Sequence, residues 1–256
     1  MSPTSPQRPQ KIKAVFFDFM GTCLDWHKSV TASFPPSVSQ SDASKLALEW
    51  RRRYFMSNSF RVQQDLGPED IDTTLARTLE HILRDDPLES VTLSDAQKAD
   101  FDTSETKQRM ISAWHNQPAW PEVPKAIQTI RRDLGLEVFV HANGTTRLQL
   151  DLTRSSGLSF DMLFSSQLLG VYKPDPKAYA KGLELVKLQP EEVVLVAAHA
   201  YDLRGAKECG MKTIYVHRWT DDVDEDMDTV RGEFDVFLEG GMEELPAKIE
   251  AMILML

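Results

Sequence analysis

The chain has 256 residues, of which 41% are hydrophobic and 27% charged, so it can bury the core of one large domain or two smaller ones. Its net charge of −10 disfavours nucleic acid and anionic membranes as partners, and no apolar run is long enough to span a membrane. The two cysteines, Cys23 and Cys209, show no zinc or disulfide spacing, which favours a reducing, cytoplasmic location.

Residues 1–10 are rich in Pro, Ser and Gln and predict a disordered leader. The apolar run at 13–17 predicts a buried parallel strand that ends at Asp18. Helical periodicity then dominates residues 27–118, with helices predicted at 44–60, 68–83 and 103–114.

Strands and helices alternate after residue 118. Strands are predicted at 136–140, 162–164, 193–197, 213–216 and 236–238, and helices at 122–134, 147–155, 175–186 and 203–209. This alternation predicts an α/β fold, in which a parallel sheet has helices on both faces. We therefore expect a Rossmann-like core formed by residues 11–26 and 119–256, with a helical cap inserted at 27–118.

Four polar residues fall at or after the predicted strand ends, namely Asp18, Asn143, Lys173 and Asp202. Ligands of such sheets bind at the carboxyl ends of the strands. Asp18 can act there as a nucleophile or bind a cation, and Lys173 can neutralise and orient it. Asp202 can complete a Mg²⁺ site with Asp18, or position a water. The alternative is that Asp18 caps a helix and Lys173 forms a surface ion pair.

Four segments carry a family resemblance: 17–22 (FDFMGT), 142–144 (ANG), 172–175 (YKPD) and 198–203 (AHAYDL). They resemble the four motifs of the haloacid dehalogenase (HAD) superfamily, and are most similar to those of the type II 2-haloacid dehalogenases. The resemblance covers nearly the whole chain and implies the fold described above. Arg51, Lys173 and Tyr179 match residues of the dehalogenase site, and a homodimer is implied because such relatives are often dimers.

Several positions depart from the family pattern. HAD phosphatases carry a second aspartate two residues after the first, where this chain has Met20, which cannot donate a proton. Ala142 stands where the second motif has Ser or Thr. Dehalogenases have Asn and Ser at positions that are His199 and Ala197 here. These departures weaken both the phosphatase and the dehalogenase interpretation.

The segment 70–74 (DIDTT) resembles the proton-donor motif of class II terpene cyclases that make drimane sesquiterpenes, some of which are fungal HAD-like proteins. This resemblance implies that Asp72 is the proton donor, supported by Asp70. The implied substrate contacts are Thr73, Thr74, Arg51, Asn143, His199, Trp50 and Tyr54. Acids at this position are equally typical of the first turn of a helix.

Our main hypothesis is therefore a HAD-like cyclase that converts farnesyl diphosphate into a drimane-type diphosphate or alcohol, with Mg²⁺ and the Asp18 pocket holding the diphosphate. The alternative is a HAD hydrolase with Asp18 as nucleophile, either a 2-haloacid dehalogenase or a phosphatase of small or prenyl phosphates. A third hypothesis is an inactive anion-binding relative. The acidic run at 221–226 is interpreted as a solvated loop rather than a metal-binding cluster.

Overall fold

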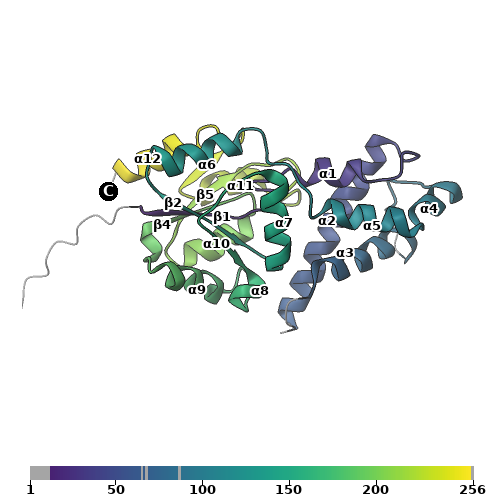
Figure 1. Cartoon of the computed structure of the whole chain (residues 1–256), viewed down its shortest axis with the longest axis horizontal. Helices are drawn as coiled ribbons and strands as arrows, with labels where there is room; N and C mark the ends of the chain where they lie inside the picture. Colours follow the sequence, from purple (N-terminus) through teal and green to yellow (C-terminus); the bar gives the residue numbers. More distant parts are fainter. Residues whose placement is uncertain (1–11, 65, 67–68, 86–87, 255–256) are drawn as a thin grey trace, which may run out of the picture.

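The computed structural model describes residues 12–64, 66, 69–85 and 88–254. The predicted leader at 1–10 and the predicted helix start at Pro68 lie outside these residues. The described chain forms a parallel sheet with a lobe of helices beside it (Figure 1). The predicted α/β fold is confirmed.

The sheet has six parallel strands in the order β3-β2-β1-β4-β5-β6. Their bounds are β1 (Ala14–Phe17), β2 (Glu137–Ala142), β3 (Met162–Ser165), β4 (Val193–Ala197), β5 (Lys212–Val216) and β6 (Val236–Leu238). The chain moves outward from β1 to β3 and then returns to β4 on the other side of β1. Strand order therefore reverses between β1 and β4, which places a crevice at their carboxyl ends.

Helices cover both faces of the sheet because successive strand side chains point to opposite sides. Val15 and Phe17 of β1 pack in the core shared with α6 (Val123–Arg132), α7 (Thr146–Ser156) and α12 (Leu245–Leu254). Ala14 and Phe16 pack in the core shared with α8 (Ser166–Leu169), α9 (Pro176–Val186), α10 (Ala200–Glu208) and α11 (Met227–Glu233). Figure 1 shows α6 and α12 on one side of the sheet and α8 to α10 on the other.

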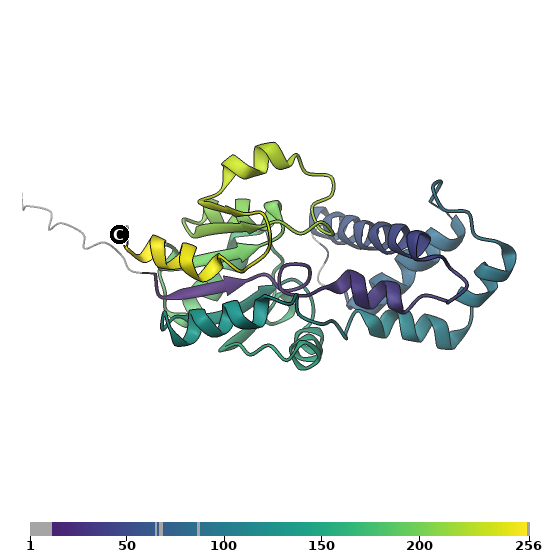
Figure 2. The same cartoon turned by 90° about the horizontal axis from the view of Figure 1, so that it is seen from above.

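The helical lobe comprises α1 (Trp26–Ala32), α2 (Gln40–Gln63), α3 (Ile71–Glu80), the π-helical turn η1 (His81–Asp85), α4 (Asp95–Phe101) and α5 (Ser104–Ala113). It lies at one end of the molecule in both perpendicular views (Figure 2). Three buried tryptophans form its centre: Trp26 stacks on Trp114 at 5.5 Å, and Trp50 meets Trp114 edge-on at 5.2 Å. The chain enters and leaves the lobe side by side, through a bridge between Leu24 and Ala119.

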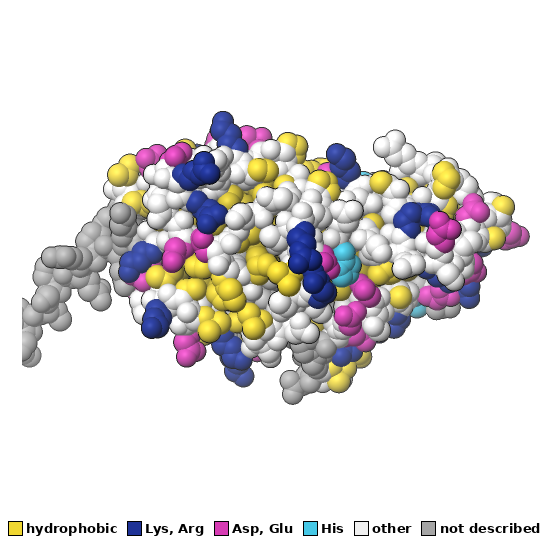
Figure 3. Space-filling view, viewed as in Figure 1, with side chains coloured by type: hydrophobic (Ala, Val, Ile, Leu, Met, Phe, Trp, Pro, Cys, Tyr) yellow, Lys and Arg dark blue, Asp and Glu magenta, His cyan; other side chains and the backbone are white. Residues whose placement is uncertain are grey.

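The lobe helices α1 and α4, and α8 and α11 of the core, were not predicted. Helices α1 and α4 are each only seven residues long. The start of α4 depends on a capping box between Ser94 and Gln97 rather than on an apolar stripe. Helix α3 begins at Ile71 because the Asp70 side chain caps it. Within the described ranges, no helix is both long and apolar enough to cross a membrane. The face seen in Figure 3 carries acidic and basic side chains interspersed.

Candidate active site

Asp18 follows the last residue of β1. Its backbone N–H donates to the carbonyl of Val196 in β4 at 3.0 Å. Thr22 Oγ1 donates to Asp18 Oδ2 at 2.6 Å and accepts from the backbone N–H of Ala198 at 2.9 Å. The carboxylate is thereby fixed between β1 and β4, in the crevice where strand order reverses.

The ammonium of Lys173 lies between two carboxylates. Its Nζ is 3.0 Å from Asp18 Oδ1 and 2.5 Å from Asp202 Oδ2, and it donates to the carbonyl of His141 at 2.6 Å. The other oxygen of Asp202 accepts from the Tyr179 hydroxyl at 2.8 Å. All three donors of the ammonium are therefore used, which fixes its position.

Asn143 holds the backbone of Lys173 from both sides. Its Oδ1 accepts from the Lys173 N–H at 2.8 Å, and its Nδ2 donates to the Lys173 carbonyl at 3.0 Å. Burial opposes the charge on Lys173, but Asp18 and Asp202 outweigh it and raise the lysine pKa. Burial also opposes the charge on Asp18, but Lys173 and His199 lower the Asp18 pKa well below its usual range. Asp18 is therefore an anion near neutral pH.

His199 connects Asp18 to a further buried carboxylate. Its Nδ1 lies 3.0 Å from Asp18 Oδ2, and its Nε2 lies 3.1 Å from Asp221 Oδ1. Burial would lower the pKa of His199, but the two carboxylates outweigh burial and raise it to about 10. His199 is therefore an imidazolium in this state.

Asp221 is only 5% exposed and is bound on several sides. Arg51 Nη2 donates to its Oδ1 at 3.1 Å, and Trp26 Nε1 donates to its Oδ2 at 3.0 Å. Burial opposes its charge, but Arg51 and His199 lower the Asp221 pKa below its usual range. The Asp221 carboxylate fills the space over Gly21, where an added Cβ would lie 2.6 Å from both carboxylate oxygens. The φ of Gly21 is +88°, which also favours glycine at this position.

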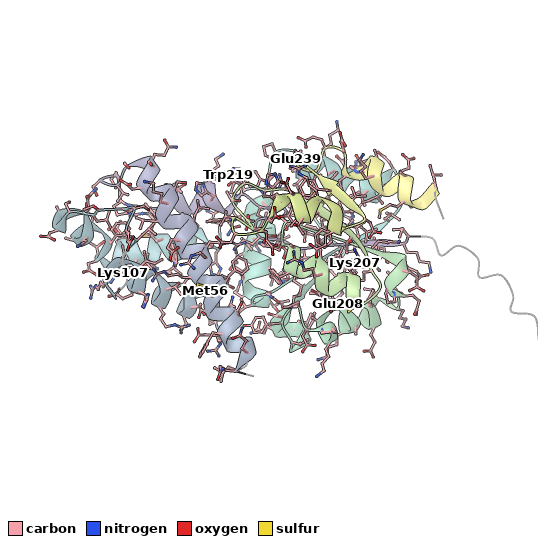
Figure 4. The ribbon with its side chains drawn as sticks, turned by 180° about the vertical axis from the view of Figure 1, so that it is seen from behind. Met56, Lys107, Lys207, Glu208, Trp219 and Glu239 are labelled. Atoms are coloured by element: carbon pink, nitrogen blue, oxygen red, sulfur yellow. The ribbon has the colours of Figure 1, made fainter. Side chains whose placement is uncertain are left out.

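The loop that carries Asp221 runs along the junction between sheet and lobe. Trp219, two residues before Asp221, packs edge-on against the His27 ring of α1 at 4.7 Å. Figure 4 shows Trp219 at this junction. Elements from both parts of the molecule therefore meet around Asp18.

A cavity of about 520 Å³ opens beside these groups. Six of the residues predicted from the sequence line it: Asp18, Arg51, Tyr54, Asn143, Lys173 and His199. The Arg51 guanidinium lies 4.6 Å from the centre of the Phe55 ring and 5.1 Å from that of Trp26. Asp202 is fully buried beneath Lys173 and is absent from the described residues that line the cavity.

Trp50 does not line the cavity, in contrast to its prediction. It is fully buried in the lobe, where its Nε1 donates to the Leu75 carbonyl at 3.0 Å and lies 3.1 Å from Thr78 Oγ1. Trp50 therefore stabilises the packing of α2 on α3. The helical periodicity placed it on an apolar face but could not show what that face packs against.

The segment 70–74 also lies apart from the cavity. Asp70 accepts from the Asp72 N–H at 2.9 Å and caps α3, while Thr74 Oγ1 donates to Glu69 at 2.5 Å. Asp72 pairs with His115 at 2.8 Å, its side chain is 49% exposed, and Thr73 is exposed. Among the described cavity-lining residues, none comes from this segment. The roles predicted for Asp70, Asp72, Thr73 and Thr74 are therefore not supported by their positions.

The predicted Mg²⁺ site does not fit these side chains. The Lys173 ammonium occupies the position between Asp18 and Asp202 that a shared cation would need, and Asp202 is sealed by Tyr179. In the described part of the chain, no group of three or more His, Cys, Asp or Glu side chains is arranged to hold a metal ion.

Asp221 was missed because it begins the acidic run 221–226, which was interpreted as a solvated loop. That interpretation is wrong for Asp221, although Asp224 and Asp226 are exposed. The available signal was position: residue 221 follows β5, whose carboxyl end lies at the same edge of the sheet as Asp18.

A family model described as haloacid dehalogenase-like hydrolase matches residues 12–210, and the chain belongs to this family of hydrolases. Among its relatives, (S)-2-haloacid dehalogenase 4A of Burkholderia cepacia is 26% identical over 81% of this chain and 84% of its own length. Haloacetate dehalogenase H-2 of Moraxella sp. (strain B) is 25% identical over 82% of this chain and 88% of its own length. A crystal structure of an L-2-haloacid dehalogenase matches with a TM-score of 0.74 and 27% identity, covering 94% of this chain and 99% of its own.

These comparisons overturn the main hypothesis. The relatives that match along most of the chain are dehalogenases, and they give no support to the drimane cyclase subgroup or to a prenyl diphosphate substrate. The physical reason lies in α3, where Asp72 has a histidine partner and solvent contact. A carboxylic acid that protonates an alkene needs instead an enclosed apolar site that excludes water. The five-letter resemblance reflects helix capping.

Proposed function

We propose that the chain is a hydrolytic dehalogenase of small 2-haloacids, with Asp18 as the nucleophile. The observation that carries this proposal is the Asp18 carboxylate, kept ionised at a strand end and facing a cavity. The activities of the relatives, (S)-2-haloacid and haloacetate dehalogenation, support the substrate class.

The reaction takes two steps. A carboxylate oxygen of Asp18 forms a bond to the carbon that carries the halogen, and the halide leaves with the bonding electron pair. Water then adds to the carboxyl carbon of the resulting ester, which releases the 2-hydroxyacid and regenerates the carboxylate. Lys173 holds Asp18 in position for both steps, and Asn143 positions Lys173.

Arg51 is the group we assign to the substrate carboxylate. Its guanidinium lines the cavity, and its Nε is buried without a hydrogen-bond partner. A buried donor without a partner is costly, so a substrate oxygen bound there would recover a lost interaction. In this proposal, residues 27–118 act as the cap that covers the core site.

The phosphatase alternative is less consistent with the site. Met20 stands at the position of the general acid in HAD phosphatases, and its thioether sulfur accepts a contact from Arg51 Nη1 at 2.7 Å. A thioether has no proton to give to a leaving alkoxide. Departure of a halide needs no proton, so the same residue does not impede dehalogenation.

The test is halide release from chloroacetate and from each enantiomer of 2-chloropropionate. We expect turnover by the natural protein and a loss of about 1,000-fold or more in Asp18→Asn. The matched control is Asp133→Asn, which removes an exposed carboxylate at the end of α6 and should leave the rate unchanged. An absence of halide release from all three substrates would sink the proposal.

A further inference from the structure

The 2-haloacid dehalogenases that this chain resembles have an asparagine at the position of His199. A histidine at this position can act as a base, which an asparagine cannot. Imidazole can both accept and donate a proton near neutral pH, whereas an amide side chain cannot act as a base. His199 Nδ1 lies 3.0 Å from Asp18, and its Nε2 lies 3.1 Å from Asp221. His199 therefore contacts both the proposed nucleophile, Asp18, and a second carboxylate, Asp221, that can orient its ring.

Asp221 is held too firmly to be an incidental neighbour. Trp26, Arg51 and the Thr220 hydroxyl all donate to it, the last at 2.8 Å. These donors come from both the lobe and the loop after β5. A buried carboxylate with this many partners fixes the orientation and tautomer of the imidazole that it contacts.

We propose that His199 is the general base that activates water for hydrolysis of the Asp18 ester, and that Asp221 is its positioning residue. This inference rests on the dehalogenase function proposed above. It makes Asp18, His199 and Asp221 a catalytic triad built on a HAD-type sheet.

Formation of the ester consumes the Asp18 anion and releases halide, and the His199 imidazolium then loses one proton to solvent. Neutral His199, with Nε2–H donating to Asp221, accepts a proton from water through Nδ1 while the water oxygen adds to Asp18 Cγ. As the tetrahedral intermediate collapses, the His199 imidazolium gives this proton to the departing alkoxide oxygen and the hydroxyacid leaves. The Asp18 carboxylic acid that remains then transfers its proton to His199 Nδ1, which restores the Asp18 carboxylate and the His199 imidazolium. The sum is organohalide plus water giving alcohol, halide and one proton.

The covalent step itself makes the histidine available as a base. His199 is cationic in the free enzyme because two carboxylates contact it. Ester formation removes the charge of Asp18, so the pKa of His199 falls and the proton can leave. The charged or titratable groups that face the ring are Asp18 on the loop after β1, Asp221 and Asp222 on the loop after β5, Tyr201 on α10 and Arg51 on α2.

The experiment is His199→Asn, followed by rapid halide measurement and intact-protein mass. We expect a burst of about one halide per active site, then steady turnover slowed by about 100-fold or more, because only the second step needs the base. The protein mass should increase by that of the esterified acid, located at Asp18. The burst itself shows that the variant is folded. His217→Asn, at the end of β5 and paired with Glu239, is the matched control and should turn over normally.

Asp221→Asn tests the positioning role through a pH profile. Loss of that anion lowers the pKa of the esterified enzyme's histidine, so the rise of steady-state rate with pH should move to lower pH while the maximal rate falls. Asp226→Asn, on the same loop at the start of α11, should leave the profile in place because Asn caps helices as well as Asp.

The outcomes separate the two proposals. A burst and mass increase in His199→Asn support both. Steady turnover in His199→Asn equal to that of the natural protein, with no accumulated ester, overturns the triad and leaves the dehalogenase function standing. A natural protein that releases no halide overturns the dehalogenase function and the triad with it.

Discussion

Two acidic segments of this molecule contrast sharply. Asp18 lies at the end of β1, is 6% exposed, and is surrounded by Lys173, His199 and Thr22. Asp72 lies in the first turn of α3, is half exposed, and contacts His115. Both segments resembled catalytic motifs in the sequence, yet only one carboxylate faces the cavity.

The difference lies in what surrounds each carboxylate. A buried anion must be matched by donors from distant parts of the chain, and such an arrangement is costly unless it is complete. An acid at a helix start satisfies local N–H groups and needs no such support. Charge partners contributed by several strands are therefore the stronger sign of a functional site, and three perturbations test this contrast.

Lys173→Met should have the largest effect. It leaves Asp18 and Asp202 buried without their shared cation, so we expect unfolding to be easier by about 3–5 kcal/mol and halide release to fall by about 100-fold or more. Urea unfolding and the halide assay measure the two effects. Lys177→Met, an exposed lysine at the start of α9, should change stability by about 0.5 kcal/mol or less. Equal effects of Lys173→Met and Lys177→Met on stability and halide release would contradict the view that the buried charge partners of Asp18 mark the functional site.

The pH dependence of stability should show the next largest effect. The folded-state pKa of His199, about 10, lies above the ordinary value of 6.5. Its stabilising contribution is therefore complete below pH 6.5 and is lost as pH rises toward 10. At pH 7 the free energy of unfolding of the natural protein should exceed that of His199→Asn by up to about 4 kcal/mol.

The difference in free energy of unfolding between the natural protein and His199→Asn should decrease steadily up to pH 10. Urea unfolding of both proteins at a series of pH values measures it. A difference in unfolding free energy that stays constant from pH 6 to pH 10 would show that the charge on His199 does not stabilise the fold.

Substitutions in the α3 segment should have the smallest effects. Asp70→Ala removes the helix cap and should cost about 1 kcal/mol, while Asp72→Ala removes a partly exposed contact with His115 and should cost about 0.5 kcal/mol or less. Neither should change halide release. Thermal unfolding and the halide assay test both. Loss of activity in Asp72→Ala with the fold intact would reinstate a role for this segment.

Much of the core was predictable because periodicity and position carry the information. The strands from β1 to β6 were found from short apolar runs, and Asp18, Asn143 and Lys173 were placed together because parallel strands end at one edge. The family fold followed from motifs spread over the same elements.

The rest depended on loop paths and on packing between distant helices, which a local pattern does not encode. Asp221 reaches the site through the loop after β5, and Arg51 and Trp26 reach it from the lobe. Trp50 was placed on the right helix face, but its partners belong to α3. The homodimer remains a prediction.

Gly21 has a consequence for engineering. Its missing side chain leaves the volume that the Asp221 oxygens fill, 2.6 Å from where a Cβ would lie. One methyl group at position 21 would work as a spacer, displacing the third member of the triad while every ionisable group stays in the chain. Position 21 thus controls how far the loop after β5 reaches, and with it whether ester hydrolysis is assisted, through side-chain volume together with the strain that any Cβ meets at a φ of +88°.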